Sequence, residues 1–279
     1  MGDIMLVQSY SHGASTKPLI GETLGVNFDA AVKKWGERDA LVVRHQNVRW
    51  SYLELQEKVN AFAAGLLNLG LEPGDRVGIW SPNNSEWVVV QYATAKAGLI
   101  LVNINPAYRV AELEYAINKV GCKALILASS FKSSDYVAMV GELAPEISKS
   151  TPGNISCGRL PSLNTLIQIG GKTNDGYFDF GQIPGLASDK DFERLKVLSD
   201  ELQFDDPINI QFTSGTTGFP KGATLTHFNV LNNGYFTGEG LKFTSSDKLC
   251  VPVPLYHCFG MVLSNVAALT HGAALVYPA

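Results

Sequence analysis

The sequence has 279 residues, of which 46% are hydrophobic and 17% are charged, and its formal net charge is −4 at pH 7. A chain of this length and hydrophobicity can bury a large core in one or two globular domains. Its lysines and arginines are scattered and do not form the basic cluster that nucleic-acid-binding proteins carry. We therefore expect a globular protein that does not bind nucleic acid.

The four cysteines lie far apart without a Cys-x-x-Cys pair, and the five histidines show no spacing typical of metal ligands. Residues 1–18 lack the basic and apolar segments of a secretory signal, and no apolar run approaches the length of a transmembrane helix. These features predict reduced thiols, no structural metal site and no transmembrane segment. We expect a cytoplasmic location, with the mitochondrial matrix as the alternative.

Strand and helix signals alternate through the first half of the chain. Ser51 and Glu54 have the spacing of a capping box ahead of an amphipathic run that Gly70 ends, which predicts a helix over residues 53–67. We further predict strands over residues 76–80, 99–103 and 124–128, and helices over residues 85–96 and 111–120. The predicted fold class is therefore α/β, with stacked layers of mostly parallel sheet and helices.

The second half begins with a less regular stretch, residues 148–190, in which only residues 165–169 have the pattern of a strand. Apolar residues at 208, 210 and 212 alternate with polar ones, which predicts a half-buried strand. Thr226 is a candidate N-cap for the helix that follows. Pro252 and Pro254 restrict the next extended segment to a sheet edge or a strand end, before a helix around residues 262–269 and a strand over residues 273–277.

Residues 213–222 have the composition of a phosphate-binding loop. Four hydroxyl side chains, three glycines and one lysine fall within this stretch, directly after a predicted strand. The glycines allow backbone N–H groups to converge on an anion, the hydroxyls add donors, and the lysine adds a positive charge. The candidate nucleotide-binding residues are Thr213, Ser214, Gly215, Thr216, Thr217, Gly218, Phe219, Pro220 and Lys221.

The spacing of this loop differs from that of a Walker A loop, because Phe219 and Pro220 separate the last loop glycine from Lys221. The string closed by Pro-Lys-Gly resembles the signature loop of the acyl-adenylate-forming (AMP-binding) superfamily. Segments 50–55, 73–77 and 103–106 also look like those of acyl-CoA synthetases, so the resemblance covers about residues 25–279. Together with Tyr-His-Cys-Phe-Gly at residues 256–260, the loop looks most like the fatty acyl-CoA synthetase branch, and specifically like its medium-chain members.

The resemblance implies a two-step reaction. A fatty carboxylate and Mg-ATP form acyl-AMP and pyrophosphate, and the thiol of coenzyme A then displaces AMP, so ATP, Mg²⁺ and coenzyme A are the implied cofactors and co-substrates. His257 and Gly260 match the positions of a superfamily motif at the acyl-binding site, where the histidine would act by position and electrostatics. A purely structural role for this lone histidine is the alternative.

Several superfamily segments do not occur in residues 1–279. The sequence has no Tyr-Gly-x-Thr-Glu segment, which would contact adenine and magnesium, and no Thr-Gly-Asp segment, which would hold ribose. The catalytic lysine of the superfamily is expected beyond Ala279. We therefore assign no catalytic residue and no metal ligand within these residues, and expect an N-terminal portion that is inactive alone.

The resemblance also implies a division into the N-terminal subdomains of the acyl-adenylate-forming fold. We expect an N-terminal extension over residues 1–24 and an incomplete subdomain that carries the phosphate loop and combines residues 25–50 with residues 206–279. A second α/β subdomain would comprise residues 51–205, including the irregular connection near residues 148–190. Two other functions stay open, namely adenylation of an aryl or amino acid and a non-catalytic interaction module, and so does a homodimer.

Overall fold

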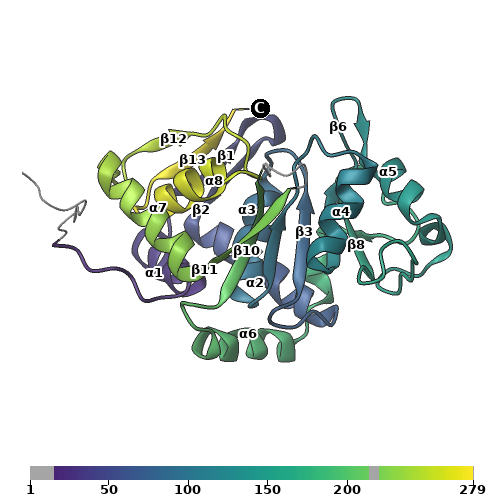
Figure 1. The fold of residues 1–279 in the computed structure, drawn as a ribbon. Helices are drawn as coiled ribbons and strands as arrows, with labels where there is room; N and C mark the ends of the chain where they lie inside the picture. Colours follow the sequence, from purple (N-terminus) through teal and green to yellow (C-terminus); the bar gives the residue numbers. More distant parts are fainter. Residues whose placement is uncertain (1–15, 214–219, 279) are drawn as a thin grey trace, which may run out of the picture.

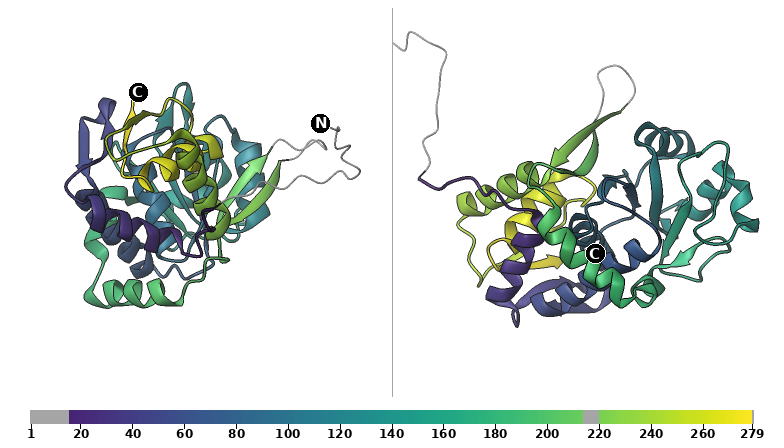
Figure 2. Two further views of the ribbon diagram at one scale, coloured as in Figure 1. Left: turned by 90° about the vertical axis from the view of Figure 1, so that its left-hand side faces the viewer. Right: turned by 90° about the horizontal axis from the view of Figure 1, so that it is seen from below.

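The computed structural model describes residues 16–213 and 220–278 and shows an α/β protein with two main sheets (Figure 1). Helices lie between the two sheets and on the outer face of the larger one (Figure 2). This arrangement confirms the predicted α/β class with stacked layers. Within the described ranges, no helix is both long enough and apolar enough to cross a bilayer.

The larger sheet carries the residues that matter most for function. Its neighbouring strands pair in parallel, except β10 and β11, which form an antiparallel hairpin at one edge. Along the sheet the order is β11 (Lys221–Thr226), β10 (Pro207–Thr213), β4 (Ile100–Asn103), β3 (Arg76–Trp80), β5 (Cys122–Ala128), β8 (Thr165–Ile169) and β9 (Phe178–Asp179). Because β4 lies on one side of β3 and β5 on the other, the direction in which the sheet grows reverses at β3.

The smaller sheet has the order β12 (Lys248–Cys250), β13 (Ala274–Tyr277), β1 (Asp39–Val43) and β2 (Val48–Ser51). The short helix η1 (Arg44–Gln46) connects β1 to β2, which is an edge strand. A separate two-stranded ribbon is formed by β6 (Ser130–Phe131) and β7 (Ser134–Asp135).

Residues 25–50 and 206–279, which we expected to form one subdomain, do not form a single sheet. β10 pairs with β4 and β11 pairs with β10, so both belong to the larger sheet. Only β12 and β13 join β1 and β2. Alternation along the sequence predicts strands and crossovers, but the choice of partner depends on packing between distant segments. The domain boundaries themselves remain a prediction.

The long helices begin and end at recognisable capping residues. Ser51 caps α2 with the predicted capping box to Glu54, Gly121 ends α4 with φ of 62°, and Thr226 caps α7 as predicted. The helices are α1 (Leu24–Trp35), α2 (Tyr52–Asn68), α3 (Ser85–Lys96), α4 (Val110–Val120), α5 (Tyr136–Leu143), α6 (Asp189–Glu201) and α7 (His227–Leu241), with shorter turns η2 (Pro145–Lys149) and η3 (Phe180–Leu186).

The last helical segment is continuous but not uniform. It consists of α8 (Cys258–Gly260), a π-helical stretch η4 (Met261–Val266) and α9 (Ala267–Leu269). It packs on α7, which lies beside it in the structure (Figure 1). The π-helical hydrogen-bond pattern is rare and often accompanies a functional site.

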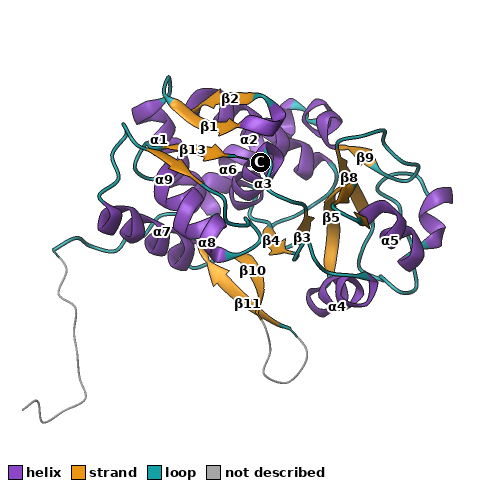
Figure 3. Cartoon of the chain, turned by 90° about the horizontal axis from the view of Figure 1, so that it is seen from above, coloured by secondary structure: helices purple, strands orange, loops and turns teal. Residues whose placement is uncertain are grey.

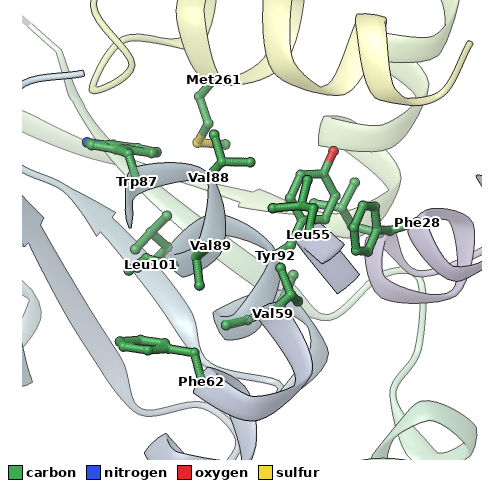
Figure 4. Close-up of a cluster of buried hydrophobic side chains, with 14 of the residues drawn as sticks. Phe28, Leu55, Val59, Phe62, Trp87, Val88, Val89, Tyr92, Leu101 and Met261 are labelled. Carbon is green, nitrogen blue, oxygen red and sulfur yellow. The ribbon is translucent and has the colours of Figure 1, made fainter. Parts of the chain in front are cut away.

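Two hydrophobic cores hold the layers together. The first joins both sheets to α1, α2, α3 and the segment 258–269, and Figure 4 shows Leu55, Val59, Val88 and Met261 converging within it. The second lies on the other face of the larger sheet, under α4 and α5. The larger sheet is therefore covered on both faces.

This cover explains why the predicted half-buried character of β10 is wrong. Asn209 and Gln211 were expected to face solvent, but they are only 1% and 8% exposed. The Asn209 amide donates to the Leu101 carbonyl and to Asn103 Oδ1, both at 2.9 Å. Their alternation with apolar residues therefore marks a polar row inside the protein rather than a solvent face.

Candidate functional site

The two arms of the candidate phosphate loop are β10 and β11. Thr213 and Lys221 are register partners where the chain passes from one strand to the other, and the Thr213 hydroxyl lies 3.5 Å from the Lys221 carbonyl, to which it donates. Both side chains are exposed, at the end of a hairpin that projects from the sheet edge (Figure 3). The hairpin thus presents a hydroxyl and an ammonium group together. The predicted residues Ser214, Gly215, Thr216, Thr217, Gly218 and Phe219 lie outside the described residues.

A tyrosine on α4 contacts the end of the loop. The hydroxyl of Tyr115, which is half-buried, donates to the Pro220 carbonyl at 3.0 Å. Close packing continues at Gly222, where a Cβ atom would lie 3.1 Å from Ile210 and 3.7 Å from Val120 at the end of α4. Helix α4 therefore positions the second arm. Sequence reasoning missed this contact because Tyr115 precedes Pro220 by 105 residues and its helical pattern gives no sign of its partner.

A buried histidine anchors the base of the hairpin. His227, the first residue of α7, is fully buried, and its Nδ1 accepts a hydrogen bond from the Leu24 backbone N–H at 3.0 Å. Burial lowers the pKa of His227 to about 4, against a smaller opposing effect of Asp206. The imidazole is thus neutral at pH 7 and joins α1 to the start of α7. The predicted start of a helix directly after Thr226 is confirmed, while the contact of His227 with Leu24 was not predicted.

An open pocket of about 520 Å³ lies at the carboxyl ends of β3, β4 and β5. In open α/β sheets, ligands bind at this end of the strands, beside the point where the strand order reverses. The pocket lining therefore includes residues that directly follow each of these strands, together with others from the segment after β12: Pro82, Asn83, Asn105, Pro106, Phe131, Pro252, Pro254 and Tyr256.

Two aromatic side chains hold the Asn-Pro wall of this pocket. The Trp80 and Tyr136 rings stack with centroids 3.7 Å apart. Trp80 Nε1 donates to the Asn105 carbonyl at 3.1 Å, and the Tyr136 hydroxyl donates to the Pro106 carbonyl at 2.7 Å. The turn after β4 is thereby fixed by β3 and α5. Segment 103–106 was noted for its resemblance to acyl-CoA synthetases, but its support by these two rings was not predicted.

Two asparagines hold the segment that leads to His257. The Asn83 side chain donates to the Val253 carbonyl at 2.9 Å and accepts from the Leu255 N–H at 2.8 Å. The Asn103 side chain donates to the Tyr256 carbonyl at 3.0 Å. Since β12 ends at Cys250, residues 252–257 are not a strand, in agreement with the predicted strand end at a sheet edge. The ends of β3 and β4 therefore position this segment.

The two predicted acyl-site residues have different surroundings. His257 is exposed and caps α8, where its Nδ1 accepts from the Phe259 N–H at 3.1 Å, and its neighbour Tyr256 lines the pocket. Gly260 is buried, and a Cβ atom there would lie only 2.5 Å from the Pro254 carbonyl oxygen. His257 is thus accessible, whereas Gly260 permits close backbone packing beneath it.

Tyr108 precedes α4. Burial raises its pKa, and the charge of Glu112 in the first turn of α4 raises it further. Within residues 16–213 and 220–278, no group of three His, Cys, Asp or Glu side chains is placed to hold a metal ion. The four cysteines are free thiols.

Comparison with known families matches residues 28–279 to the family described as AMP-binding enzyme. The medium-chain acyl-CoA ligase ACSF2, mitochondrial, of zebrafish (Danio rerio) is 44% identical over 98% of the chain, and that of human (Homo sapiens) is 42% identical over 96%. The chain covers 45% and 44% of these relatives, so it spans less than half of their length.

Among solved structures, the anthranilate CoA ligase AuaEII in complex with anthranoyl-AMP is similar with a TM-score of 0.76. The similarity covers 93% of this chain and 45% of that one, at 20% sequence identity. It therefore shows the fold. The described strands and helices correspond to the N-terminal part of this α/β architecture.

Proposed function

The chain belongs to the AMP-binding enzyme family, and we propose that it is the N-terminal portion of an ATP-dependent medium-chain fatty acyl-CoA ligase. The observation that carries this proposal is the similarity to medium-chain ligases along nearly the whole chain. The phosphate-loop hairpin and the pocket at the carboxyl ends of β3, β4 and β5 support it, because they offer an anion site and an apolar-lined site on one edge of one sheet.

In the proposed first step, a carboxylate oxygen attacks the α-phosphorus of ATP, an acyl phosphate bond forms and pyrophosphate leaves. The sulfur of coenzyme A then attacks the acyl carbonyl, a thioester forms and AMP leaves. A carboxylate is already ionised at pH 7, so the first step needs no general base. The protein contributes positioning and charge stabilisation, which supply most of the catalysis in phosphoryl-transfer reactions.

We assign the roles of the binding residues as follows. Thr213 and Lys221, with residues 214–220 between them, would hold the β- and γ-phosphates that leave as pyrophosphate. His257 is exposed next to Tyr256 and would orient the carboxylate, while Gly260 keeps the backbone under it closely packed. Mg²⁺ bound to ATP would neutralise phosphate charge, and Mg²⁺ usually takes its ligands from phosphates, water and one or two carboxylates.

The test is the release of pyrophosphate from Mg-ATP in the presence of octanoate. We expect no turnover by residues 1–279 alone, and turnover once the chain is joined to the complementary C-terminal part of the zebrafish ligase. Octanoate is compared with benzoate and phenylalanine. If benzoate or phenylalanine is the better substrate, the enzyme activates an aryl acid or an amino acid and the proposed fatty acid substrate is wrong. No activation of any acid, together with self-association that ignores Mg-ATP in light scattering, would support an interaction module instead.

The cytoplasmic location expected from the sequence finds no support in the relatives, since both are named as mitochondrial. We therefore propose the alternative, the mitochondrial matrix, which subcellular fractionation with an antibody against the chain would test. A homodimer also remains a proposal, and sedimentation velocity would measure it.

A further inference from the structure

A second pocket, of about 620 Å³, lies between β2, α2, α3 and η3. It shares no lining residue with the pocket at the carboxyl ends of β3, β4 and β5. Gln46 forms part of its wall, because its amide donates to Glu86 Oε2 at 2.7 Å and accepts from the Ser85 N–H at 2.7 Å. The second pocket is thus separate from the first, and hydrogen bonds hold part of its wall in place. Its volume lies within the range of about 300–1,000 Å³ that is typical of small-molecule sites.

The floor of this second pocket is aromatic. Phe62 on α2 is fully buried and stacks on Phe180 of η3, with ring centroids 4.3 Å apart and 24° between the ring planes. Trp50 is half-buried on β2, whose outer side has no neighbouring strand in the sheet. Trp50 and Phe180 are partly exposed and offer flat apolar surface to a ligand, while Phe62 supports Phe180 from below.

The rim of the pocket carries an unequal charge. Lys58 Nζ lies 4.7 Å from the Trp50 ring centroid, in the geometry of a cation–π contact. Glu57 and Glu86 also line the pocket, and neither forms an ion pair with any residue in the described part of the chain. The lining thus contains two carboxylates and one ammonium group, and that ammonium group already lies over the indole. Glu86 Oε2 also accepts hydrogen bonds from Gln46 and Ser85.

We propose that this second pocket binds an organic cation in which a protonated amine is joined to a flat apolar group, as in an arylalkylamine. The ligand amine would take the place of Lys58 Nζ over the Trp50 ring and lie near the two carboxylates. Its apolar group would cover the partly exposed ring of Phe180. An anionic ligand is disfavoured because it would meet two carboxylates at the rim. This site is independent of the proposed acyl-CoA ligase function.

The test uses the 279-residue chain and three probes of similar size: 2-phenylethylammonium, 3-phenylpropionate and 3-phenylpropan-1-ol. Isothermal titration calorimetry at pH 7 should show that the ammonium probe binds at least tenfold more tightly than the carboxylate probe, with the alcohol between them. Added salt should decrease the affinity for the ammonium probe more than the affinity for the other two probes. No measurable binding of the ammonium probe, or equal binding of the carboxylate probe, would overturn the proposal.

Four variants locate the binding. Lys58→Met keeps the length of the side chain and removes its competing positive charge. We therefore expect it to increase the affinity for the ammonium probe by about two- to fivefold, whereas it would decrease the affinity of a site that binds anions. Glu57→Gln should decrease the affinity for the ammonium probe by about two- to fivefold, and Trp50→Leu should decrease it by about tenfold. The matched control is Glu193→Gln on the exposed face of α6, which makes the same change of charge away from the pocket.

The control variant should bind the probe as the parent chain does. Circular dichroism establishes that each variant is folded. If Lys58→Met weakens the ammonium probe, or if Trp50→Leu leaves its affinity unchanged in a folded chain, the ligand does not occupy this pocket and the proposal is wrong. Equal effects of Glu57→Gln and Glu193→Gln would show only general charge attraction and would likewise refute it.

Discussion

Acid should destabilise the chain through His227 in a defined pH window. The pKa of this buried imidazole is about 4 in the folded chain and 6.5 in its ordinary state. Below pH 6.5 the unfolded chain therefore binds a proton that the folded chain does not, and stability falls as pH decreases. This difference between the two pKa values corresponds to about 3 kcal/mol in the free energy of unfolding. The chain loses this stability at about 1.4 kcal/mol per pH unit as the pH falls to about 4.

The structure gives a local reason for this low pKa in addition to burial. His227 Nδ1 accepts a hydrogen bond from the Leu24 N–H, and protonation would turn this acceptor into a second donor. The protonated imidazole would therefore face an N–H group at 3.0 Å in a fully buried position. Detachment of α1 from α7 should accompany the loss of stability.

Urea unfolding at pH 7, 5.5 and 4.5, followed by circular dichroism, measures this effect in the parent chain and in His227→Gln. Glutamine cannot titrate, so its curve between pH 6.5 and 4.5 should be flatter than that of the parent by about 2 kcal/mol or more. The exposed His45→Gln serves as the control and should follow the parent. Equal losses in the parent and in His227→Gln would refute the assignment.

Two further predictions follow from the site. Tyr115→Phe removes the hydroxyl that donates to the Pro220 carbonyl, so Mg-ATP affinity measured by calorimetry should fall by about fivefold, the equivalent of one hydrogen bond, with at most a small decrease in melting temperature. Gly260→Ala places a Cβ atom 2.5 Å from the Pro254 carbonyl oxygen and should destabilise the chain by about 1–3 kcal/mol in urea titrations. Gly240→Ala, which meets nothing within 4 Å on α7, should instead stabilise it by about 0.5–1 kcal/mol. A stabilising effect of alanine at residue 260 would contradict the packing argument.

The parts of the fold that were predictable depend on neighbours in the sequence. Ser51 and Glu54 form the predicted capping box, and Thr226 caps α7, because capping involves residues only three positions apart. Helix α6 was missed, although Ser188 and Asp191 form a capping box there and Leu195 and Leu198 are buried at helical spacing. It directly follows the irregular stretch over residues 148–190 and is mostly polar, so its narrow apolar stripe was overlooked.

The features that were not predictable depend on contacts between distant residues. Asn209 and Gln211 show the alternation of a solvent-facing strand, yet both faces of the larger sheet are covered, so both amides are buried and the Asn209 amide donates to the Leu101 carbonyl. Burial of a polar side chain is decided by the element that packs over it, and nothing near residue 209 encodes that element. The same reason explains why the pairing of β10 with β4 was not predicted.

The candidate site combines both kinds of information. Pro252 and Pro254 predict a sheet edge or a strand end, because proline has no N–H to donate, and the edge strand β12 does end at Cys250, before both prolines. The prolines do not predict which residue makes the hydrogen bonds that a neighbouring strand would otherwise make. Asn83 makes them, since its amide both donates to the Val253 carbonyl and accepts from the Leu255 N–H, as a paired strand would. The position of His257 therefore depends on the carboxyl ends of β3 and β4, the same strand ends that form the pocket, so the pocket and this histidine should move as one unit.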